Sequence, residues 1–261
     1  MKTEKFSLWD NVPGTYDSVP EIVAYIPENK KTDSAVIIFP GGGYGMLCDY
    51  EGADYAKFLA ENGITAFVTY YRVTPHHFPL PLLDARRSVR FVRHNAEKFG
   101  INKNKIAVMG SSAGGHLAAL TSTYFEPIEF ECADEIDSEE FIPNAQILCY
   151  PVIRLLGKGI AHLGSGNSLL GDMHAEMGEE LSPDLIASEK TPKAFIWHTS
   201  DDNCVDVRNS LYYAAKLHEL GIDTECHIFP NGRHGLALCG DTPYVARWTD
   251  MLLAWLSYIG F

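Results

Sequence analysis

Ser112 stands at the centre of Gly110-Ser111-Ser112-Ala113-Gly114, which matches the pattern G-x-S-x-G. This pattern is typical of a serine on a sharp turn between a strand and a helix, where small neighbours tolerate the strained backbone. Such a serine attacks acyl carbons once a base removes its proton. Ser111 is out of register, because the pattern would then require glycine at position 109, where the sequence has Met109. We therefore expect Ser112 to be a nucleophile and Ser111 to pack or hydrogen bond beside it.

The base and the carboxylate that a serine nucleophile requires follow two later predicted strands. The usual base is a histidine that a carboxylate holds in position. Asp201 and Asp202 follow one of these strands, and His234 follows the other in a glycine-flanked loop. Loops at the carboxyl ends of parallel strands are where sites form in α/β proteins. Ser112, Asp202 and His234 satisfy the order serine, acid, histidine, with Asp201 as the alternative acid or a capping residue.

A glycine triplet, Gly41-Gly42-Gly43, follows Pro40 at the end of another predicted strand. When a serine attacks an ester, negative charge develops on the carbonyl oxygen, and backbone N–H donors stabilise it. Lipases and esterases carry such donors in a His-Gly-Gly-Gly element, which has histidine where this chain has Pro40. We expect the N–H groups of Gly42, Gly43 and Ala113 to form an oxyanion hole.

Other histidines compete with His234 for a functional role. His198 precedes the acid loop and is placed to orient it. A metal site built from His198, His234 and the aspartates would need ligand spacing that the sequence lacks, so we expect no metal and no cofactor. The remaining histidines that we weighed are expected to be surface or packing residues: His76, His77, His94, His116, His218 and His227.

The elements that position these residues alternate along the chain. Short runs of β-branched and aromatic residues alternate with longer segments of helical period, which predicts an α/β fold with a mostly parallel central sheet of about eight strands and helices on both faces. The predicted strands cover 21–26, 35–39, 64–70, 105–109, 145–150, 194–198 and 225–229. The predicted helices cover 50–61, 82–99, 116–124, 208–220 and 244–258, with a small-residue turn at 110–115.

Two segments do not fit this alternation, and we expect insertions or caps at about 125–143 and 155–188 of a single domain spanning 1–261. The stretch 126–140 has eight carboxylates in 15 residues and no Lys or Arg, which favours a solvated, mobile loop over a binding surface. The stretch 155–188 is rich in Gly and Ser and has only weak helical periods.

Composition restricts the partners. The 261 residues include 21 Lys and Arg and 34 Asp and Glu, so the formal charge is 21 − 34 = −13. This excess repels phosphate backbones and anionic lipids, so we expect a small-molecule substrate and neither nucleic acid nor membrane. The N-terminus has no apolar signal sequence, and the six cysteines are scattered, so we expect a cytoplasmic protein with reduced thiols. Assembly into a homo-oligomer stays open.

Several motifs together resemble the α/β-hydrolase carboxylesterases. They are Pro40-Gly41-Gly42-Gly43-Tyr44, Glu51-Gly52, Tyr71-Arg72, Gly110 to Ala118, Asn167 to Gly171, Asp201-Asp202 and His234-Gly235. The similarity begins near residue 20 and is closest to the acetyl esterase or acetylxylan esterase branch, sometimes labelled sugar hydrolases and related to the hormone-sensitive-lipase-like esterases. The resemblance implies Ser112 as nucleophile, Asp202 as acid and His234 as base. Pro40 in place of histidine argues against close kinship with the lipases.

The substrate is less well defined by the sequence. Tyr44, Leu47, Tyr71 and Tyr150 lie near predicted strand ends or the glycine loop, so we expect them to line an acyl or alcohol pocket, although core packing explains each equally well. The acidic insertion favours a short acyl group on a polar alcohol over a long lipid chain, and we favour acetyl groups on sugars. Two alternatives remain: a serine peptidase on the same fold and a catalytically silent binding protein.

Overall fold

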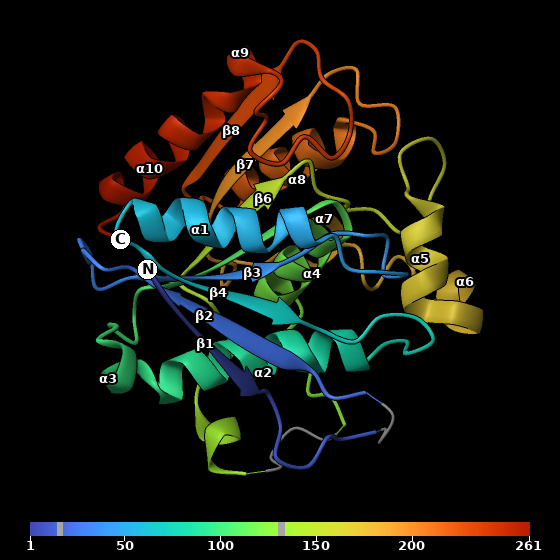
Figure 1. Cartoon of the computed structure of the whole chain (residues 1–261). Helices are drawn as coiled ribbons and strands as arrows, with labels where there is room; N and C mark the ends of the chain where they lie inside the picture. Colours follow the sequence, from blue (N-terminus) through green and yellow to red (C-terminus); the bar gives the residue numbers. More distant parts are fainter. Residues whose placement is uncertain (15–17, 130–133) are drawn as a thin grey trace.

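The computed structural model describes residues 1–14, 18–129 and 134–261. Its described strands form one eight-stranded sheet in the order β1-β2-β4-β3-β5-β6-β7-β8 (Figure 1). They are β1 (Lys2–Ser7), β2 (Glu21–Ile26), β3 (Ala35–Phe39), β4 (Thr65–Tyr70), β5 (Ile106–Ser111), β6 (Ala145–Cys149), β7 (Lys193–Thr199) and β8 (Thr224–Phe229). From β4 across to β8 neighbouring strands are parallel, and β2 pairs antiparallel with β1 and β4. The predicted mostly parallel sheet is confirmed.

Strand β1 is the one strand that the sequence pattern did not predict. Its residues are exposed or half-buried and include Lys2, Glu4 and Lys5. Because β1 lies at the edge of the sheet, its side chains need not be apolar, and charged residues on an edge strand discourage pairing with other chains. By contrast, all five residues of β3 in the middle of the sheet are buried, which produces the continuous apolar run that the sequence shows.

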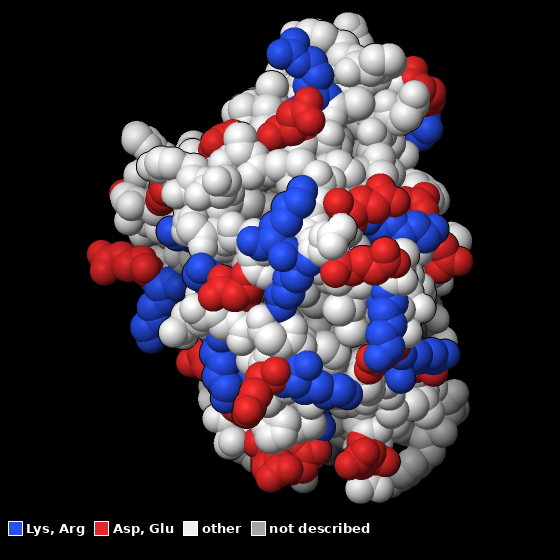
Figure 2. All heavy atoms as spheres, turned by 60° about the vertical axis from the view of Figure 1, so that its left-hand side comes forward, with Lys and Arg blue, Asp and Glu red and all other residues white. Residues whose placement is uncertain are grey.

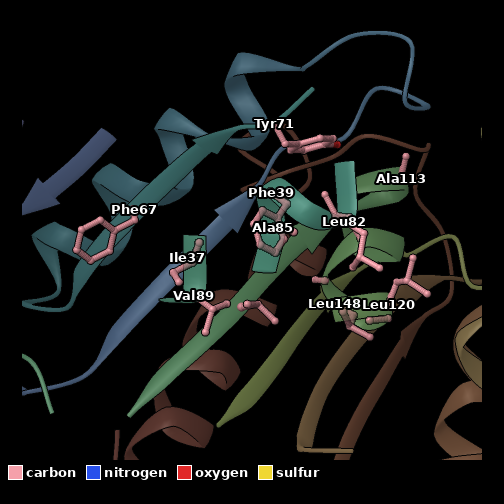
Figure 3. Close-up of a cluster of buried hydrophobic side chains, with 14 of the residues drawn as sticks. Ile37, Phe39, Phe67, Tyr71, Leu82, Ala85, Val89, Ala113, Leu120 and Leu148 are labelled. Atoms are coloured by element: carbon pink, nitrogen blue, oxygen red, sulfur yellow. The ribbon is translucent and has the colours of Figure 1, made fainter. Parts of the chain in front are cut away.

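Helices cover both faces of the sheet. On one face α1 (Ala53–Glu61) and α10 (Trp248–Tyr258) bury Tyr55, Leu59 and Trp248. On the other face α2 (Leu80–His94), α4 (Ser112–Thr123) and α8 (Arg208–Glu219) pack against the sheet, and Figure 3 shows Leu82 and Leu120 in that cluster. The shorter helices are α3 (Ala96–Phe99), α5 (Leu163–Leu170), α6 (His174–Met177), α7 (Pro183–Ile186) and α9 (Pro243–Ala246), with 3-10 turns η1 (Asp49–Glu51), η2 (Glu135–Ser138) and η3 (Gly171–Met173).

The ends of several elements differ from the prediction. The predicted turn at 110–115 is wrong, because β5 continues through Ser111 and α4 begins at Ser112 without an intervening loop. The predicted helix 82–99 begins earlier and is interrupted at Asn95, whose side-chain amide donates to the carbonyl of Phe91 at 2.9 Å. An asparagine that bonds to its own helix backbone competes with helical continuation.

The described part of the acidic segment 126–140 lies against α2. Arg87 is 2% exposed and donates to Asp134 at 2.6 Å and to Asp137 at 2.9 Å. The prediction of a solvated, mobile loop is therefore wrong for Asp134 and Asp137, because a buried guanidinium binds their carboxylates. Other carboxylate residues of the segment are exposed, as predicted: Glu126, Glu129, Glu135 and Glu140. Residues 130–133, which the same prediction covered, lie outside the described ranges.

The segment 155–188 contains α5, η3, α6 and α7. Helices α5 and α6 lie beyond the carboxyl ends of the strands, whereas α7 lies beside α4 and α8 (Figure 1). Its beginning and end are tied together, because the N–H of Leu155 donates to Ser182 Oγ at 3.1 Å and His174 Nε2 donates to the carbonyl of Leu155 at 2.7 Å. Arg154, just before the segment, donates to both carboxylate oxygens of Asp184 at 2.8 Å. The segment is therefore attached to the end of β6 by specific polar contacts.

On the face shown in Figure 2, acidic side chains are interspersed with Lys and Arg, so the surplus of carboxylates forms no single acidic patch there. Within the described residues, no helix has both the length and the apolar character that crossing a membrane requires.

Candidate active site

Ser112 lies where β5 passes directly into α4. Its φ is 53°, in the left-handed region that non-glycine residues rarely adopt. The neighbouring glycines make this backbone path feasible: a Cβ at Gly110 would lie 2.0 Å from the carbonyl oxygen of Gly114, and a Cβ at Gly114 would lie 2.0 Å from the carbonyl oxygen of Phe39. The G-x-S-x-G spacing therefore reflects close backbone contact on both sides of a strained serine, which raises its hydroxyl out of the turn.

The structure brings Ser112, His234 and Asp202 together in one chain of hydrogen bonds. Ser112 Oγ donates to His234 Nε2 at 2.8 Å, and His234 Nδ1 donates to Asp202 Oδ2 at 2.7 Å. The three residues follow β5, β8 and β7, whose carboxyl ends lie at the same edge of the sheet. This geometry lets a histidine accept the serine proton while a carboxylate holds the resulting positive charge.

The environment of Asp202 favours its ionised form. Its side chain is fully buried, which opposes ionisation, but hydrogen bonds from His198 and His234 and from the backbone N–H of Val205 outweigh burial and hold its pKa well below the usual range. His198 Nε2 lies 3.2 Å from Asp202 Oδ2, and its Nδ1 pairs with Ser210 Oγ at 2.8 Å. His198 thus orients the carboxylate, as its position before the acid loop predicts.

Asp201 has a different position from Asp202. Its Oδ1 accepts the N–H of Gly232 at 2.6 Å, and Thr199 Oγ1 donates to the carbonyl of the same glycine at 2.7 Å. Asp201 therefore connects the acid loop to the loop that carries His234, and within the described residues it makes no hydrogen bond with the histidine ring.

The glycine loop faces Ser112 from the end of β3. Gly42 has a φ of 131°, and a Cβ there would lie 2.2 Å from the carbonyl oxygen of Met46, so only glycine fits. Within the described residues, the N–H groups of Gly42 and Gly43 donate to no protein acceptor. The N–H of Ala113 lies in the first turn of α4, where helical N–H groups have no partner within the helix. These groups are available to an anionic oxygen beside Ser112.

Glu51 is a component of the site to which the sequence analysis assigned no role. One carboxylate oxygen accepts the N–H of Gly41 at 3.0 Å, and the other accepts the hydroxyl of Tyr150 at 2.7 Å. The same tyrosine oxygen accepts the N–H of Ala237 at 3.0 Å, just after the loop of His234. Burial raises the pKa of Glu51, although Tyr150, His234 and Gly41 oppose the rise. Glu51 and Tyr150 therefore join the glycine loop to the histidine loop.

None of the four residues that were expected to line a substrate pocket is among the residues that line the cavity beside Ser112. Tyr44, Tyr71 and Tyr150 are at most 2% exposed, and Figure 3 shows Tyr71 beside the hydrophobic cluster. Tyr71 donates to the carbonyl of Pro40 at 2.6 Å, so it supports the glycine loop from behind. Leu47 is half-buried and packs against the apolar core. A large aromatic side chain near a strand end is equally suited to hold a loop in place, and the sequence does not distinguish the two roles.

The cavity beside Ser112 has a volume of about 240 Å³. It is lined by Gly42, Gly43, Cys48, Tyr50, Glu51, Ser112, His162, Cys204 and His234. Five of these were not predicted as site residues, namely Cys48, Tyr50, Glu51, His162 and Cys204. No local sequence motif marks His162 or Cys204 as a site residue. Their place beside Ser112 and His234 becomes visible only in the three-dimensional fold. In the described part of the chain, no group of three or more His, Cys, Asp or Glu residues could hold a metal ion.

Comparison with protein families and solved structures gives a consistent result. The model of the BD-FAE family matches residues 23–217. A solved structure, an acetyl ester-xyloside bifunctional hydrolase from Caldicellulosiruptor lactoaceticus, is 42% identical with a TM-score of 0.92, and the match covers 99% of this chain and 97% of that one. Another solved structure that resembles this chain is that of an α/β hydrolase enzyme, and together with the sheet order it shows the α/β-hydrolase fold.

Two curated relatives are longer than this chain. Endo-1,4-beta-xylanase B of Butyrivibrio fibrisolvens is 34% identical over 253 residues, which are 92% of this chain and 39% of the relative. An acetylxylan esterase of Xylanibacter ruminicola is 32% identical over 249 residues, which are 93% of this chain and 49% of the relative. The chain thus spans less than half the length of either protein.

Proposed function

The chain belongs to the BD-FAE family, and we propose that it is a serine carboxylesterase that removes short acyl groups, above all acetyl, from sugars or small oligosaccharides. The observation that carries this proposal is the hydrogen-bonded series Ser112, His234 and Asp202 beside a small cavity with free backbone donors. The relatives that are named for acetylxylan and acetyl ester-xyloside chemistry support the choice of substrate.

In the first half of the proposed reaction, Ser112 Oγ attacks the acyl carbon while His234 Nε2 takes the serine proton. Negative charge then develops on the carbonyl oxygen, and the N–H groups of Gly42, Gly43 and Ala113 are the donors for it. Asp202 stabilises the histidinium that forms. His234 returns the proton to the departing alcohol oxygen as the bond from the acyl carbon to that oxygen breaks, leaving an acyl-serine.

In the second half, water takes the place of the alcohol. His234 removes a proton from the water, whose oxygen attacks the acyl carbon of the acyl-serine, and the same backbone donors stabilise the oxyanion. The bond to Ser112 Oγ then breaks, and His234 gives the proton back to the serine. The carboxylic acid leaves, and no cofactor enters either half.

The size of the cavity supports a short acyl group. About 240 Å³ beside Ser112 must hold the acyl group and the reacting atoms, whereas the pockets of drug-sized ligands are typically about 300–1,000 Å³.

The five described cysteines are unpaired, which supports the finer proposal of a reducing, cytoplasmic location.

The decisive experiment compares the hydrolysis of 4-nitrophenyl acetate by wild type, Ser112→Ala and Ser111→Ala. We expect Ser112→Ala to lower kcat/KM at least about 10⁴-fold, because the nucleophile is lost. Ser111 Oγ bonds to Tyr55 away from the cavity at 2.8 Å, so Ser111→Ala should affect stability more than activity. Equal activity of Ser112→Ala and wild type would refute this nucleophile. A wild type without esterase activity would favour a peptidase or a silent binding protein.

The two neighbouring aspartates provide a second test. Asp202→Asn should lower kcat by about 10³- to 10⁴-fold, because the histidine loses the carboxylate that selects its tautomer. Asp201→Asn keeps an oxygen that can accept the N–H of Gly232, so we expect a loss below about tenfold. Steady-state kinetics on 4-nitrophenyl acetate measures both, and a larger loss in Asp201→Asn would reverse the assignment of the acid.

A further inference from the structure

His162 has a fixed tautomer that directs a hydrogen-bond donor toward the cavity. It precedes α5, and its Nδ1 accepts the backbone N–H of Ser165 at 3.2 Å and lies 2.9 Å from the hydroxyl of the same serine. A backbone N–H can only donate, so Nδ1 of the neutral ring is unprotonated and the proton lies on Nε2. Burial and the neighbouring His234 lower the pKa of His162, although Asp202 opposes this, so the neutral ring is favoured.

The Nε2 atom of His162 has no strong partner among the described residues. This nitrogen lies 3.8 Å from Cys204 Sγ, and a thiol sulfur is a weak acceptor. Both residues line the cavity of about 240 Å³ that also contains Ser112 and His234. A polar N–H directed at this space is therefore available to a substrate oxygen.

His162 lies on the side where the alcohol must leave. In the proposed mechanism His234 protonates the departing oxygen, so the alcohol part of the ester lies next to the histidine rather than next to the glycine loop. His162 lines the same cavity as His234 and contacts Cys204, whose backbone N–H donates to Asp202 Oδ1 at 2.9 Å, so His162 lies on this same side.

A second cavity of about 500 Å³ continues from this side. It shares Cys204 with the smaller cavity and also reaches Asp202. The first part of the segment 155–188 forms one wall, and the loop after β7 forms the other, with Lys158, Asn203 and Asp206 among the polar residues. Such a wall of donors and acceptors suits hydroxyl groups better than an alkyl chain.

We infer that His162 and this larger cavity form a subsite for the sugar that carries the acyl group, in which His162 Nε2–H donates to the hydroxyl next to the ester. The inference rests on the proposed esterase function and extends it to the alcohol. His162 is then a residue that determines specificity: it contributes to sugar esters and gives no such bond to an ester whose alcohol has no neighbouring hydroxyl.

Two substitutions separate the two nitrogens of the ring. Asn in His162→Asn can retain the acceptor for Ser165 N–H but does not reach the position of Nε2, whereas Gln in His162→Gln can place its amide N–H there. His94→Asn is a matched control, because His94 is exposed at the end of α2 and lines neither cavity. The substrates are a methyl xyloside with one acetyl group and a free neighbouring hydroxyl, and its analogue that lacks this hydroxyl.

The measured quantity is the ratio of kcat/KM for the hydroxylated substrate to that for the deoxy analogue. We expect His162→Asn to lower this ratio by about 3- to 10-fold, the effect of one hydrogen bond. His162→Gln should restore the ratio to within about twofold of wild type, and His94→Asn should leave it unchanged. Because both substrates share the same chemistry, a general defect in folding or catalysis cancels from the ratio.

An unchanged ratio in His162→Asn would overturn the subsite. So would a wild type that cleaves 4-nitrophenyl acetate but neither xyloside, and in that case the esterase function would still stand. Failure of the function itself is distinct, because Ser112→Ala would then match wild type on 4-nitrophenyl acetate. Should His162→Asn fail to fold, Cys204→Phe provides a second test, because Cys204 is exposed and a phenylalanine there narrows the passage between the two cavities. We expect this variant to slow the hydrolysis of both xylosides at least about tenfold more than that of 4-nitrophenyl acetate. An equal effect on the xylosides and on 4-nitrophenyl acetate would overturn the subsite.

Discussion

The segments 126–140 and 155–188 both interrupt the alternation of strands and helices, but they are held by different forces. In the first, carboxylates and carbonyl oxygens bind the arginines of α2, which recur at positions 86, 87, 90 and 93. In the second, the ion pair between Arg154 and Asp184 is accompanied by neutral hydrogen bonds, such as those from the amide of Asn209 to Ile160 and from the backbone of Arg154 to Asn209. The carboxylate-rich segment 126–140 contains no Lys or Arg of its own, and the positive charge that binds it comes from α2.

The two segments also differ in their relation to the reaction. No described residue of 126–140 lines either cavity near Ser112, whereas 155–188 contributes His162 and the wall of the larger cavity. The second segment is also connected to α4, the helix that begins at Ser112. His116 in α4 hydrogen bonds to the hydroxyl of Tyr44 through Nδ1 and to the carbonyl of Leu181 through Nε2. Changes in the first segment should therefore alter stability alone, while changes in the second should alter activity as well.

The largest expected effect on stability comes from Arg87→Ala. Asp137 has no exposed side-chain area, so removing the arginine takes from a buried carboxylate the guanidinium that lies 2.9 Å away, while Arg90 lies farther off at 3.8 Å. Loss of one partner of a buried pair costs about 3–5 kcal/mol. We expect the free energy of unfolding in urea to fall by this amount, with kcat/KM per folded molecule unchanged. A loss of activity at full folding would contradict the separation between the two segments.

The sequence predicted the parts of the site that follow from backbone geometry and chemical order. The glycines around Ser112 have no room for a Cβ, and the strands that precede Ser112 and Asp202 are almost continuously buried, so residue type and spacing reveal these two residues. Strand β8, which precedes His234, is only half-buried, and His234 is found from its glycine-flanked loop and from its place in the order serine, acid, histidine. Residues such as Glu51 and His162 depend on contacts between distant segments. Glu51 binds Tyr150, which is 99 positions away, and no local pattern records such a pair.

The tyrosines show the opposite failure. Tyr44 and Tyr150 were predicted at the right end of the sheet but on the wrong side of the loops, because chain position does not determine whether an aromatic ring faces a cavity or the core. Their hydroxyls bond to His116 and Glu51, and full burial follows from these partners.

A smaller effect, visible only as a change with pH, is expected for His116. Burial lowers the pKa of His116 from 6.5 to about 4, although the carbonyl of Leu181 opposes this. Between pH 6.5 and about 4 the unfolded chain binds the proton at His116 and the folded chain does not. Acidification over this range therefore lowers the free energy of unfolding by about 3 kcal/mol, and above pH 6.5 this loss is absent. Gln at position 116 cannot titrate, so the stability advantage of wild type over His116→Gln should shrink by this amount between pH 7 and 4.

Urea unfolding at pH 7, 6, 5 and 4 measures this difference. His94→Gln is the matched control, since His94 is exposed and its substitution should leave the pH dependence of wild type intact. If the difference in the free energy of unfolding between wild type and His116→Gln stayed constant over this range, His116 would bind its proton equally well in the folded and the unfolded chain, which would contradict the lowered pKa.

The smallest effects come from two carboxylates that each bind an arginine, one in each segment. Asp184 is 4% exposed, and its loss of charge in Asp184→Asn should cost about 2 kcal/mol. Asp134 is 33% exposed, and Arg87 keeps Asp137, so Asp134→Asn should cost less than about 1 kcal/mol. Because Arg154 and Asp184 fix the segment that carries His162, Asp184→Asn should also lower the ratio of kcat/KM for the hydroxylated xyloside to that for its deoxy analogue, by about twofold. Asp134→Asn should leave that ratio at the wild-type value. Equal ratios in the two variants would mean that the segment 155–188 holds His162 in place without this ion pair.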